Sequence, residues 1–291
     1  ELWHLAIIAM AFVLGQRCES LHGFWLGMGL GCTISAAVAI AQAHGFVAIP
    51  TNHYPTPAGL FYNAAVSGAV GAVVLVGLLT NRLYWLIGGP LILIFLSGSR
   101  GAYVALAGTW ALAFLAALSG RGRLIALGFL VLIGAAAALL FHGPSDIIRE
   151  TIWATLIKHM SILGDGVGSL QSLYVLTPDG ISHIEHAHND YIGLAYEFGL
   201  GCLPLALAAT LVFDRRAPDF YVLCCFATLG LYYWVLYSPY TAIALGLVAG
   251  NAVRSLYGAV SRSADRRSTF LQWTSHPQRL ADGPGRQAIP I

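Results

Sequence analysis

Long apolar runs separated by short polar or Gly- and Pro-rich breaks fill most of the chain from residue 2 to residue 257. The runs are continuous and rich in Leu, Ala and Gly, and most approach the length of about 20 residues that a helix needs to cross a bilayer. We therefore predict membrane-spanning helices. Nine spans are expected, at residues 2–16, 23–43, 57–79, 83–98, 102–118, 124–141, 190–213, 219–237 and 239–257.

The composition supports the same class, because 57% of the residues are hydrophobic and only 10% are charged. We predict an all-α, polytopic transmembrane helical bundle in which residues 1–141 supply about six spans and residues 190–257 about three. Residues 142–189 are expected to form one large external loop that is partly helical, and residues 258–291 a disordered cytoplasmic tail. The first run is short and Glu1 is not an initiator Met, so we expect the natural N-terminus to be missing, together with further spans.

The cations give the orientation, because Lys and Arg accumulate in cytoplasmic loops. Threading nine spans through a bilayer puts twelve of the 15 Lys and Arg residues on one side and three on the other. The side with twelve is predicted to be cytoplasmic, so the N-terminus and the loop 142–189 are external and the C-terminus is cytoplasmic. The twelve are Arg17, Arg82, Arg121, Arg123, Arg215, Arg216, Arg254, Arg262, Arg266, Arg267, Arg279 and Arg286.

The three external cations, Arg100, Arg149 and Lys158, are candidate ligands for an anion. Arg100 lies in a short turn between two apolar runs, where a charge is costly unless it is paired or solvated. Arg149 and Lys158 are nine residues apart in a predicted helix, and we expect them on neighbouring sides of it. Arginine binds phosphate through two parallel hydrogen bonds and stays charged at physiological pH. The alternatives are a snorkelling side chain for Arg100, a local pair with Asp146 or Glu150 for Arg149, and solvated surface for Lys158.

The external loop has two further features. Residues 144–160 have the pattern of a helix. The run GDGVGS at residues 164–169 has the glycine content of a nucleotide-binding loop, but it lacks the Lys-Ser/Thr pair of a P-loop and a preceding strand. We interpret this run as a tight backbone turn that returns the loop toward the membrane. The five cysteines lie in or beside apolar runs without metal-ligand spacing, and we expect them to be small core residues.

A histidine cluster ends the loop, where the sequence HIEHAHNDY leads into an apolar run. Its spacing does not match the helical HExxH pattern of zinc proteases, and no metal is predicted. His188 is the candidate base, because it is expected in the first turn of the following helix, whose positive end favours the neutral imidazole. His186 is the alternative base and otherwise a candidate substrate ligand, and Asp190 or Glu185 can orient the imidazole through its other nitrogen.

Two polar residues accompany His188 as candidate substrate ligands. Asn189 can take part in the site, or it can cap the predicted helix. Glu197 lies in the apolar run beside Gly199 and Gly201, where an acid is costly. It can pair with an arginine of the site, face water where the glycines loosen the helix, or form a purely structural pair.

The order of these motifs resembles the O-antigen ligase and polymerase superfamily of bacterial envelopes. The resemblance covers about residues 57–213 and consists of SGSRGA at 97–102, Arg149 with Trp153 leading into LGDGVGS at 163–169, HAHNDY at 186–191 and EFGLG at 197–201. Members are multi-span glycosyltransferases of the bacterial inner membrane. They take a glycan from undecaprenyl pyrophosphate on the periplasmic face and pass it to lipid A core, to a growing polysaccharide or, in some members, to a protein hydroxyl.

The resemblance implies roles for the candidate residues. Arg100 and Arg149 match the family's essential arginines, which hold the pyrophosphate, and His188 with Asn189 matches the histidine at the end of the large periplasmic loop. His188 is then the general base for the acceptor hydroxyl, and the arginines, with Lys158, stabilise the departing undecaprenyl pyrophosphate. The resemblance implies neither a metal nor another cofactor.

Three hypotheses follow. The first is an O-antigen ligase that moves a finished glycan onto lipid A core, and the second is a polymerase or a protein O-oligosaccharyltransferase of the same chemistry. The third belongs to another class, a transporter of an anion or a lipid-linked glycan, or a membrane scaffold. A transporter is less favoured, because the sequence has no inverted repeat of interrupted helices and the candidate base lies on one face alone.

Overall fold

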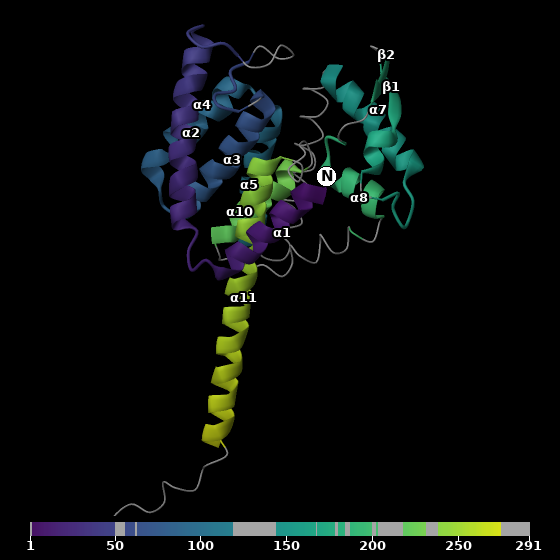
Figure 1. The fold of residues 1–291 in the computed structure, drawn as a ribbon. Helices are drawn as coiled ribbons and strands as arrows, with labels where there is room; N and C mark the ends of the chain where they lie inside the picture. The colour runs from purple at the N-terminus through teal and green to yellow at the C-terminus, as the bar shows by residue number, and fades with distance from the viewer. Residues whose placement is uncertain are drawn as a thin grey trace, which may run out of the picture.

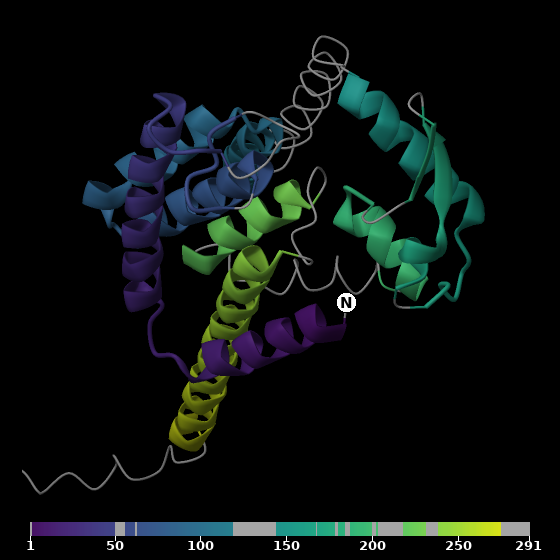
Figure 2. The same cartoon turned by 45° about the horizontal axis from the view of Figure 1, so that its top comes forward.

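The computed structural model describes residues 2–49, 56–61, 63–118, 144–166, 168–177, 180–183, 187–199, 202, 218–230 and 238–274. Within these ranges the chain is mostly helical, apart from two short 3-10 turns and a two-stranded hairpin. The predicted helical class is therefore confirmed. Figures 1 and 2 show a bundle of helices and, beside it, a smaller group of elements that carries the hairpin, which we call the outer lobe.

The bundle is built around one central helix. From Val66 to Leu78 every residue of this helix is buried, and the small Gly, Ala and Val side chains let five neighbouring helices contact it. Three cysteines are also buried, as expected: Cys32, Cys224 and Cys225. The bundle elements are α1 (Leu2–Arg17), α2 (His22–Ala43), the central α3 (Ala64–Thr80), η1 (Tyr84–Leu86), α4 (Gly88–Ser97), α5 (Arg100–Ala117), α10 (Pro218–Leu229) and α11 (Pro239–Thr274).

The helices run in the relative directions expected of a chain that crosses back and forth. α3 and α4 are antiparallel, because Gly71 lies against Ile94 whereas Gly68 lies against Ser97, further along α4. α2 and α4 each follow or precede α3 by one connection, so both should run opposite to it. They are accordingly parallel to each other. The contacts that define this are Gly29 with Leu86 and Thr33 with Gly89. α1 and α11 are likewise parallel, through Ile8 with Gly246 and Phe12 with Gly250.

The outer lobe contains the parts of residues 142–199 that the structure describes. Its helix α7 (Pro144–His159) confirms the helix expected at 144–160. A 3-10 turn η2 (Ser169–Ser172) leads into the antiparallel strands β1 (Tyr174–Thr177) and β2 (Gly180–His183), and α8 (Asp190–Phe198) follows. A small core of five buried residues joins these elements: Ile152, Leu156, Leu170, Ala187 and Tyr196.

One helix begins later than predicted. A span was expected from residue 57, but α3 begins at Ala64, where the Asn63 side chain accepts a hydrogen bond in the first turn. The preceding residues form a loop instead, because the buried Gln42 of α2 satisfies their backbone. Its Oε1 accepts hydrogen bonds from Ala58 N at 3.0 Å and Gly59 N at 2.8 Å.

Two helices end elsewhere than predicted. The run from residue 190 was expected to be helical to residue 213, but α8 ends at Phe198, because Gly199 takes a φ of 79° that a helix cannot continue through. In contrast, α11 continues to Thr274, so the disorder expected from residue 258 is wrong for that part. The sequence has neither Gly nor Pro between Gly258 and Pro277 to stop it, and α11 projects from the bundle as a rod (Figure 1).

Among the described residues, one helix, α2, is long and apolar enough to cross a membrane by itself, and five shorter apolar helices accompany it. Many large apolar side chains point away from the bundle. They include Met10, Leu14, Leu30, Ile34, Phe95, Trp110 and Phe114. The expected span at 124–141 lies outside the described residues, so the nine-span topology stays a prediction.

Candidate functional site

His188 stands just before α8, in a backbone conformation that is unusual for a side-chain-bearing residue. Its φ is 53°, and Arg82 is the other described non-glycine residue with a positive φ. The left-handed region costs an L-residue about 1–2 kcal/mol, and such outliers gather at functional sites. The N-cap of α8 is Asn189, so His188 lies one residue before the cap and not in the first turn of the helix, as was predicted. Its side chain is half-buried.

Asn189 determines how α8 begins. It is buried, and its Oδ1 accepts hydrogen bonds from Tyr191 N at 3.0 Å and from Ile192 N at 3.1 Å. These two amides would otherwise have no partner at the start of the helix. The capping role that the sequence left open is confirmed, and the cap fixes the backbone from which His188 projects.

The helix α7 is tied to the residue that precedes His188. Trp153 Nε1 donates a hydrogen bond to Ala187 O at 2.8 Å, across the core of the outer lobe. Arg149 lies one turn before Trp153, and residues four apart are neighbours on the surface of a helix. The face of α7 that carries Arg149 is therefore the face that contacts the chain beside His188.

The start of α8 rests on the end of α10 (Pro218–Leu229). Asp190 N donates to Gly230 O at 2.8 Å, and the Tyr191 hydroxyl donates to Ala227 O at 2.7 Å. A side chain at Gly230 would meet the Tyr191 ring at 3.4 Å, so the two segments approach closely. These contacts join the outer lobe to the bundle next to His188.

The helix α5 (Arg100–Ala117) runs antiparallel to α10. Thr228 Oγ1 donates to Ala105 O at 3.0 Å, whereas Thr109, one turn later in α5, lies against Cys225, earlier in α10. The start of α5 therefore lies at the same end of the bundle as Gly230, which follows α10. Arg100 is five residues before Ala105, about 7.5 Å along the helix axis, so it lies at the end of the bundle where α8 begins.

Arg100 opens α5 in the tight turn that the sequence predicted. Gly98 ends α4 with a φ of 58°, and Ser99 N donates to Ser97 Oγ at 3.3 Å. A side chain at Gly68 of α3 would collide with Ser99, so α3 packs directly against this turn. The Arg100 side chain itself is exposed.

Lys158 is placed differently from the prediction. Nine residues are two and a half turns of an α-helix, so Lys158 projects from the side of α7 opposite to Arg149. The expectation that the two cations lie on neighbouring sides is wrong. Lys158 is exposed, as in the alternative of a solvated surface.

Glu197 holds the glycine-rich turn rather than standing alone in an apolar segment. It is 3% exposed, and its Oε1 accepts from Gly168 N at 2.9 Å while its carbonyl accepts from Gly166 N at 2.9 Å. Gly164, Gly166 and Gly168 have positive φ values of 79°, 94° and 85°, so the predicted backbone turn is confirmed. This hydrogen bond gives the carboxylate a structural role, and its part in the substrate site stays a prediction.

The remaining members of the histidine cluster contribute less to the described structure. His183 ends β2, opposite Tyr174 in the hairpin register. Glu185 and His186 lie outside the described residues. The choice between His186 and His188 as the base therefore rests on the sequence and on the observed conformation of His188.

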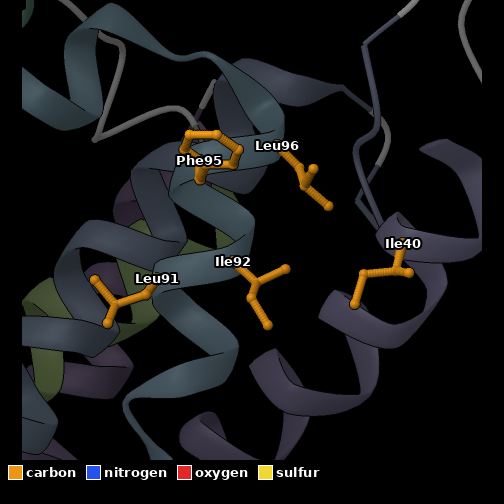
Figure 3. A pocket seen from close by; sticks show the side chains of 5 residues that line it. All are labelled: Ile40, Leu91, Ile92, Phe95 and Leu96. Atoms are coloured by element: carbon orange, nitrogen blue, oxygen red, sulfur yellow. The ribbon is translucent and has the colours of Figure 1, made fainter.

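An open apolar groove lies between α2 and α4 on the same side as the Arg100 turn. Its volume is about 410 Å³, and Figure 3 shows Ile92 and Leu96 of α4 on the side that faces Ile40 of α2. The lining is entirely apolar, and α4 ends one residue after it, at Ser97. The residues of α4 that line it are Leu91, Ile92, Phe95 and Leu96.

Comparison with known proteins adds no relative: the sequence matches no protein-family model and no curated protein.

The sequence held signals for some features that were not predicted. The tripeptide Pro178-Asp179-Gly180 is a typical turn sequence and indicates the hairpin β1–β2. The contacts of Trp153, Tyr191 and Thr228 have no such signal, because each joins residues more than 30 positions apart.

Proposed function

We propose that this chain is a membrane glycosyltransferase that moves a glycan from undecaprenyl pyrophosphate to an acceptor hydroxyl on the periplasmic face of a bacterial inner membrane. An O-antigen ligase acting on lipid A core is the preferred form. The observation that carries the proposal is the meeting of three segments. The start of α5 with Arg100, the end of α10 and the start of α8 with His188 lie at one end of the bundle, and Trp153 holds the Arg149 face of α7 beside them.

The surface of the bundle supports the membrane part of the proposal. A water-soluble monomer rarely exposes large contiguous apolar patches, whereas side chains such as Phe95 (76% exposed) and Trp110 (66% exposed) are normal against lipid. The relative directions within the pairs α3–α4, α2–α4, α1–α11 and α5–α10 agree with the alternation that nine spans require. In that topology, the end with Arg100 and His188 is periplasmic.

The apolar groove supports a donor that carries a lipid. Its lining holds no polar side chain, and Phe95 is five residues before Arg100. A long hydrocarbon chain in the groove would therefore place an attached pyrophosphate near the guanidinium. Burial of a lipid chain beside a cation is the pattern that an anionic, lipid-linked substrate needs.

The chemistry follows from these positions. His188 accepts the proton of the acceptor hydroxyl, whose oxygen attacks the anomeric carbon of the donor sugar. The bond between that carbon and the pyrophosphate oxygen breaks, and undecaprenyl pyrophosphate leaves with the electron pair. Arg100 and Arg149 stabilise the negative charge that grows on the pyrophosphate. The sugar is already activated by its leaving group, so the step needs no nucleotide.

A polymerase that extends a polysaccharide, or a protein O-oligosaccharyltransferase, would use the same groups, and a transporter of a lipid-linked glycan would share the groove. Complementation in cells that lack the full-length protein separates these functions. Loss of a ligase leaves long lipid-linked chains, and loss of a polymerase leaves single repeat units on the core. Loss of a transporter leaves the substrate on the cytoplasmic side.

The same assay tests the two arginines. Arg100→Lys and Arg149→Lys keep the charge and lose the planar fork that binds phosphate, so we expect loss of product at an unchanged protein level. Arg254→Lys is the matched control. Arg254 lies on α11 beyond Asn251, whose side chain binds Asp219 at the opposite end of α10, and it should retain activity. Full activity of both Arg100→Lys and Arg149→Lys would contradict the proposed anion site.

A further inference from the structure

The outer lobe carries an apolar tip that its own core does not cover. The tip consists of Ile162 and Leu163, which follow α7 and are 77% and 89% exposed. These are the largest exposed fractions among the large hydrophobic residues of the outer lobe, and Phe198 nearby in the fold is exposed too. Adjacent exposed Ile and Leu side chains at the end of a turn are costly in water and indicate a partner.

The tip is held firmly in place. Directly after it, Asp165 N donates to Tyr196 O at 3.0 Å and Gly166 N donates to Glu197 O at 2.9 Å. The backbones of Gly164 and Gly199 are so close that a side chain on either would collide with the other segment. The tip is therefore fixed to the C-terminal end of α8.

Because the tip is attached to the end of α8, the direction of α8 determines where the tip lies relative to the membrane. α8 begins at the end of α10 and leads, in the proposed topology, from the periplasmic face into the membrane. Figure 1 shows α8 on the lower side of the outer lobe and the hairpin on its upper side, while the bundle lies alongside. The tip lies with the inner end of α8, away from the hairpin.

The charges near the tip suit a lipid headgroup region. Lys158 and His159 precede it, and both are exposed. Asp165 follows it and is also exposed, so the tip has one permanent cation and one anion around an apolar centre. Apolar side chains flanked by a lysine are typical of segments that enter the boundary between headgroups and acyl chains, where the lysine approaches anionic phospholipid.

We propose that Ile162 and Leu163 insert into the periplasmic leaflet of a bilayer that contains anionic phospholipid, so that the outer lobe docks on the lipid surface next to the site. The proposal rests on the membrane placement proposed above. It makes the segment from Lys158 to Gly164 a membrane contact, although the loop 142–189 was expected to lie outside the bilayer. Docking fixes the height of α7, and with it Arg149, relative to the lipid.

The experiment places an environment-sensitive fluorophore on single cysteines of the full-length protein, in a background without native cysteines that still complements activity. The protein is reconstituted in vesicles of phosphatidylethanolamine and phosphatidylglycerol, with or without phospholipids that carry a quencher on the acyl chain. Leu163→Cys is the test position. Tyr174→Cys on β1, where the native side chain is 66% exposed, is the water control, and Ile34→Cys on α2, 60% exposed, is the lipid control.

We expect the label at 163 to emit at shorter wavelength and to lose most of its emission to the quencher lipid, as the label at 34 does, while the label at 174 keeps its emission. Lys158→Glu should weaken quenching at 163 in vesicles with phosphatidylglycerol. A label at 163 that behaves like the one at 174 would overturn the docking proposal. So would a label that is shielded from water but not quenched by lipid, since that indicates a protein partner. Failure of the label at 34 to be quenched would instead contradict the membrane placement itself.

Discussion

The bundle and the outer lobe are held together in different ways. The bundle has a continuous core of apolar side chains around α3, in which Val66, Val74 and Leu78 are fully buried. The outer lobe has a core of five buried residues, and specific polar contacts through Trp153, Asn189 and Glu197 supply the rest of its order. The stability of the bundle comes from the packing of many apolar side chains. The stability of the outer lobe depends more on a few hydrogen bonds and glycine conformations.

The candidate residues are divided between these two kinds of packing. The bundle carries Arg100 at the start of α5, and the lobe carries His188 and Arg149 on elements that individual hydrogen bonds, such as that of Trp153, hold together. Packing of side chains tolerates exchange of similar volumes. A hydrogen bond to a backbone amide is kept only by a side chain that places an acceptor oxygen at the same point. Substitutions in the bundle should therefore change the thermal stability of the whole protein, whereas substitutions in the outer lobe should change its local order and the activity.

The largest effect is expected in the bundle. Leu78→Ala removes a fully buried side chain of α3 that packs against Gly29 of α2, and should destabilise the protein by about 2–5 kcal/mol. Thermal unfolding in detergent measures it, and activity should fall only with the amount of folded protein. Leu78→Met, which conserves volume, is the control. Loss of activity in protein that remains folded would contradict the separation of the two regions.

The next effect concerns the joint between the turn and α8. Gly199→Ala places a side chain against Ile162 and Leu163, and the backbone conformation there, with φ 79° and ψ 172°, is essentially restricted to glycine and alone costs another residue about 1–3 kcal/mol. We expect faster proteolysis between α7 and α8 while the bundle unfolds at an unchanged temperature. Gly166→Ala, at a φ of 94° but with open space around it, separates conformational strain from collision. Equal proteolysis of both variants would rule out the collision.

A smaller effect distinguishes the two interpretations of Glu197. Glu197→Gln keeps an oxygen for Gly168 N, so the turn should survive and most of the activity with it. Glu197→Ala leaves that amide without its acceptor and should cost about 1–3 kcal/mol. Complementation and thermal unfolding on the same variants measure both. Inactive Glu197→Gln at unchanged stability would show that the charge serves the substrate, as the sequence alone allowed.

Much of the bundle could be predicted from the sequence, because apolar runs are long and their ends coincide with polar breaks. The starts of α2, α5 and α11 lie within two residues of the predicted spans. The start of α3 could not be predicted, because the buried Gln42 that satisfies the preceding loop lies more than a dozen residues away. The early end of α8 depends on one glycine conformation within an apolar run.

The sequence was enough to choose the candidate residues of the site. It was not enough to predict how these residues are arranged in space. Arg100, Arg149 and His188 stand out in the sequence by charge and position. The distance in sequence between Ala105 and Thr228, 123 positions, explains why their contact could not be foreseen. The side of α7 predicted for Lys158 is wrong, because nine residues of an α-helix put it opposite Arg149. The hydrogen bond from Gly168 N to Glu197 could not be predicted either, because it joins residues 29 positions apart.

The most direct test of the central claim compares three residues at position 188. His188→Gly removes the cost of about 1–2 kcal/mol that an L-residue has in the left-handed turn, whereas His188→Ala removes the ring and keeps that cost. Complementation by the full-length protein measures the product, with His159→Ala as an exposed histidine control. If the imidazole is the base, His188→Gly and His188→Ala both lose product although the glycine variant is the more stable. Product from His188→Gly at the level of the native protein would show that position 188 serves only the turn, and would contradict the account.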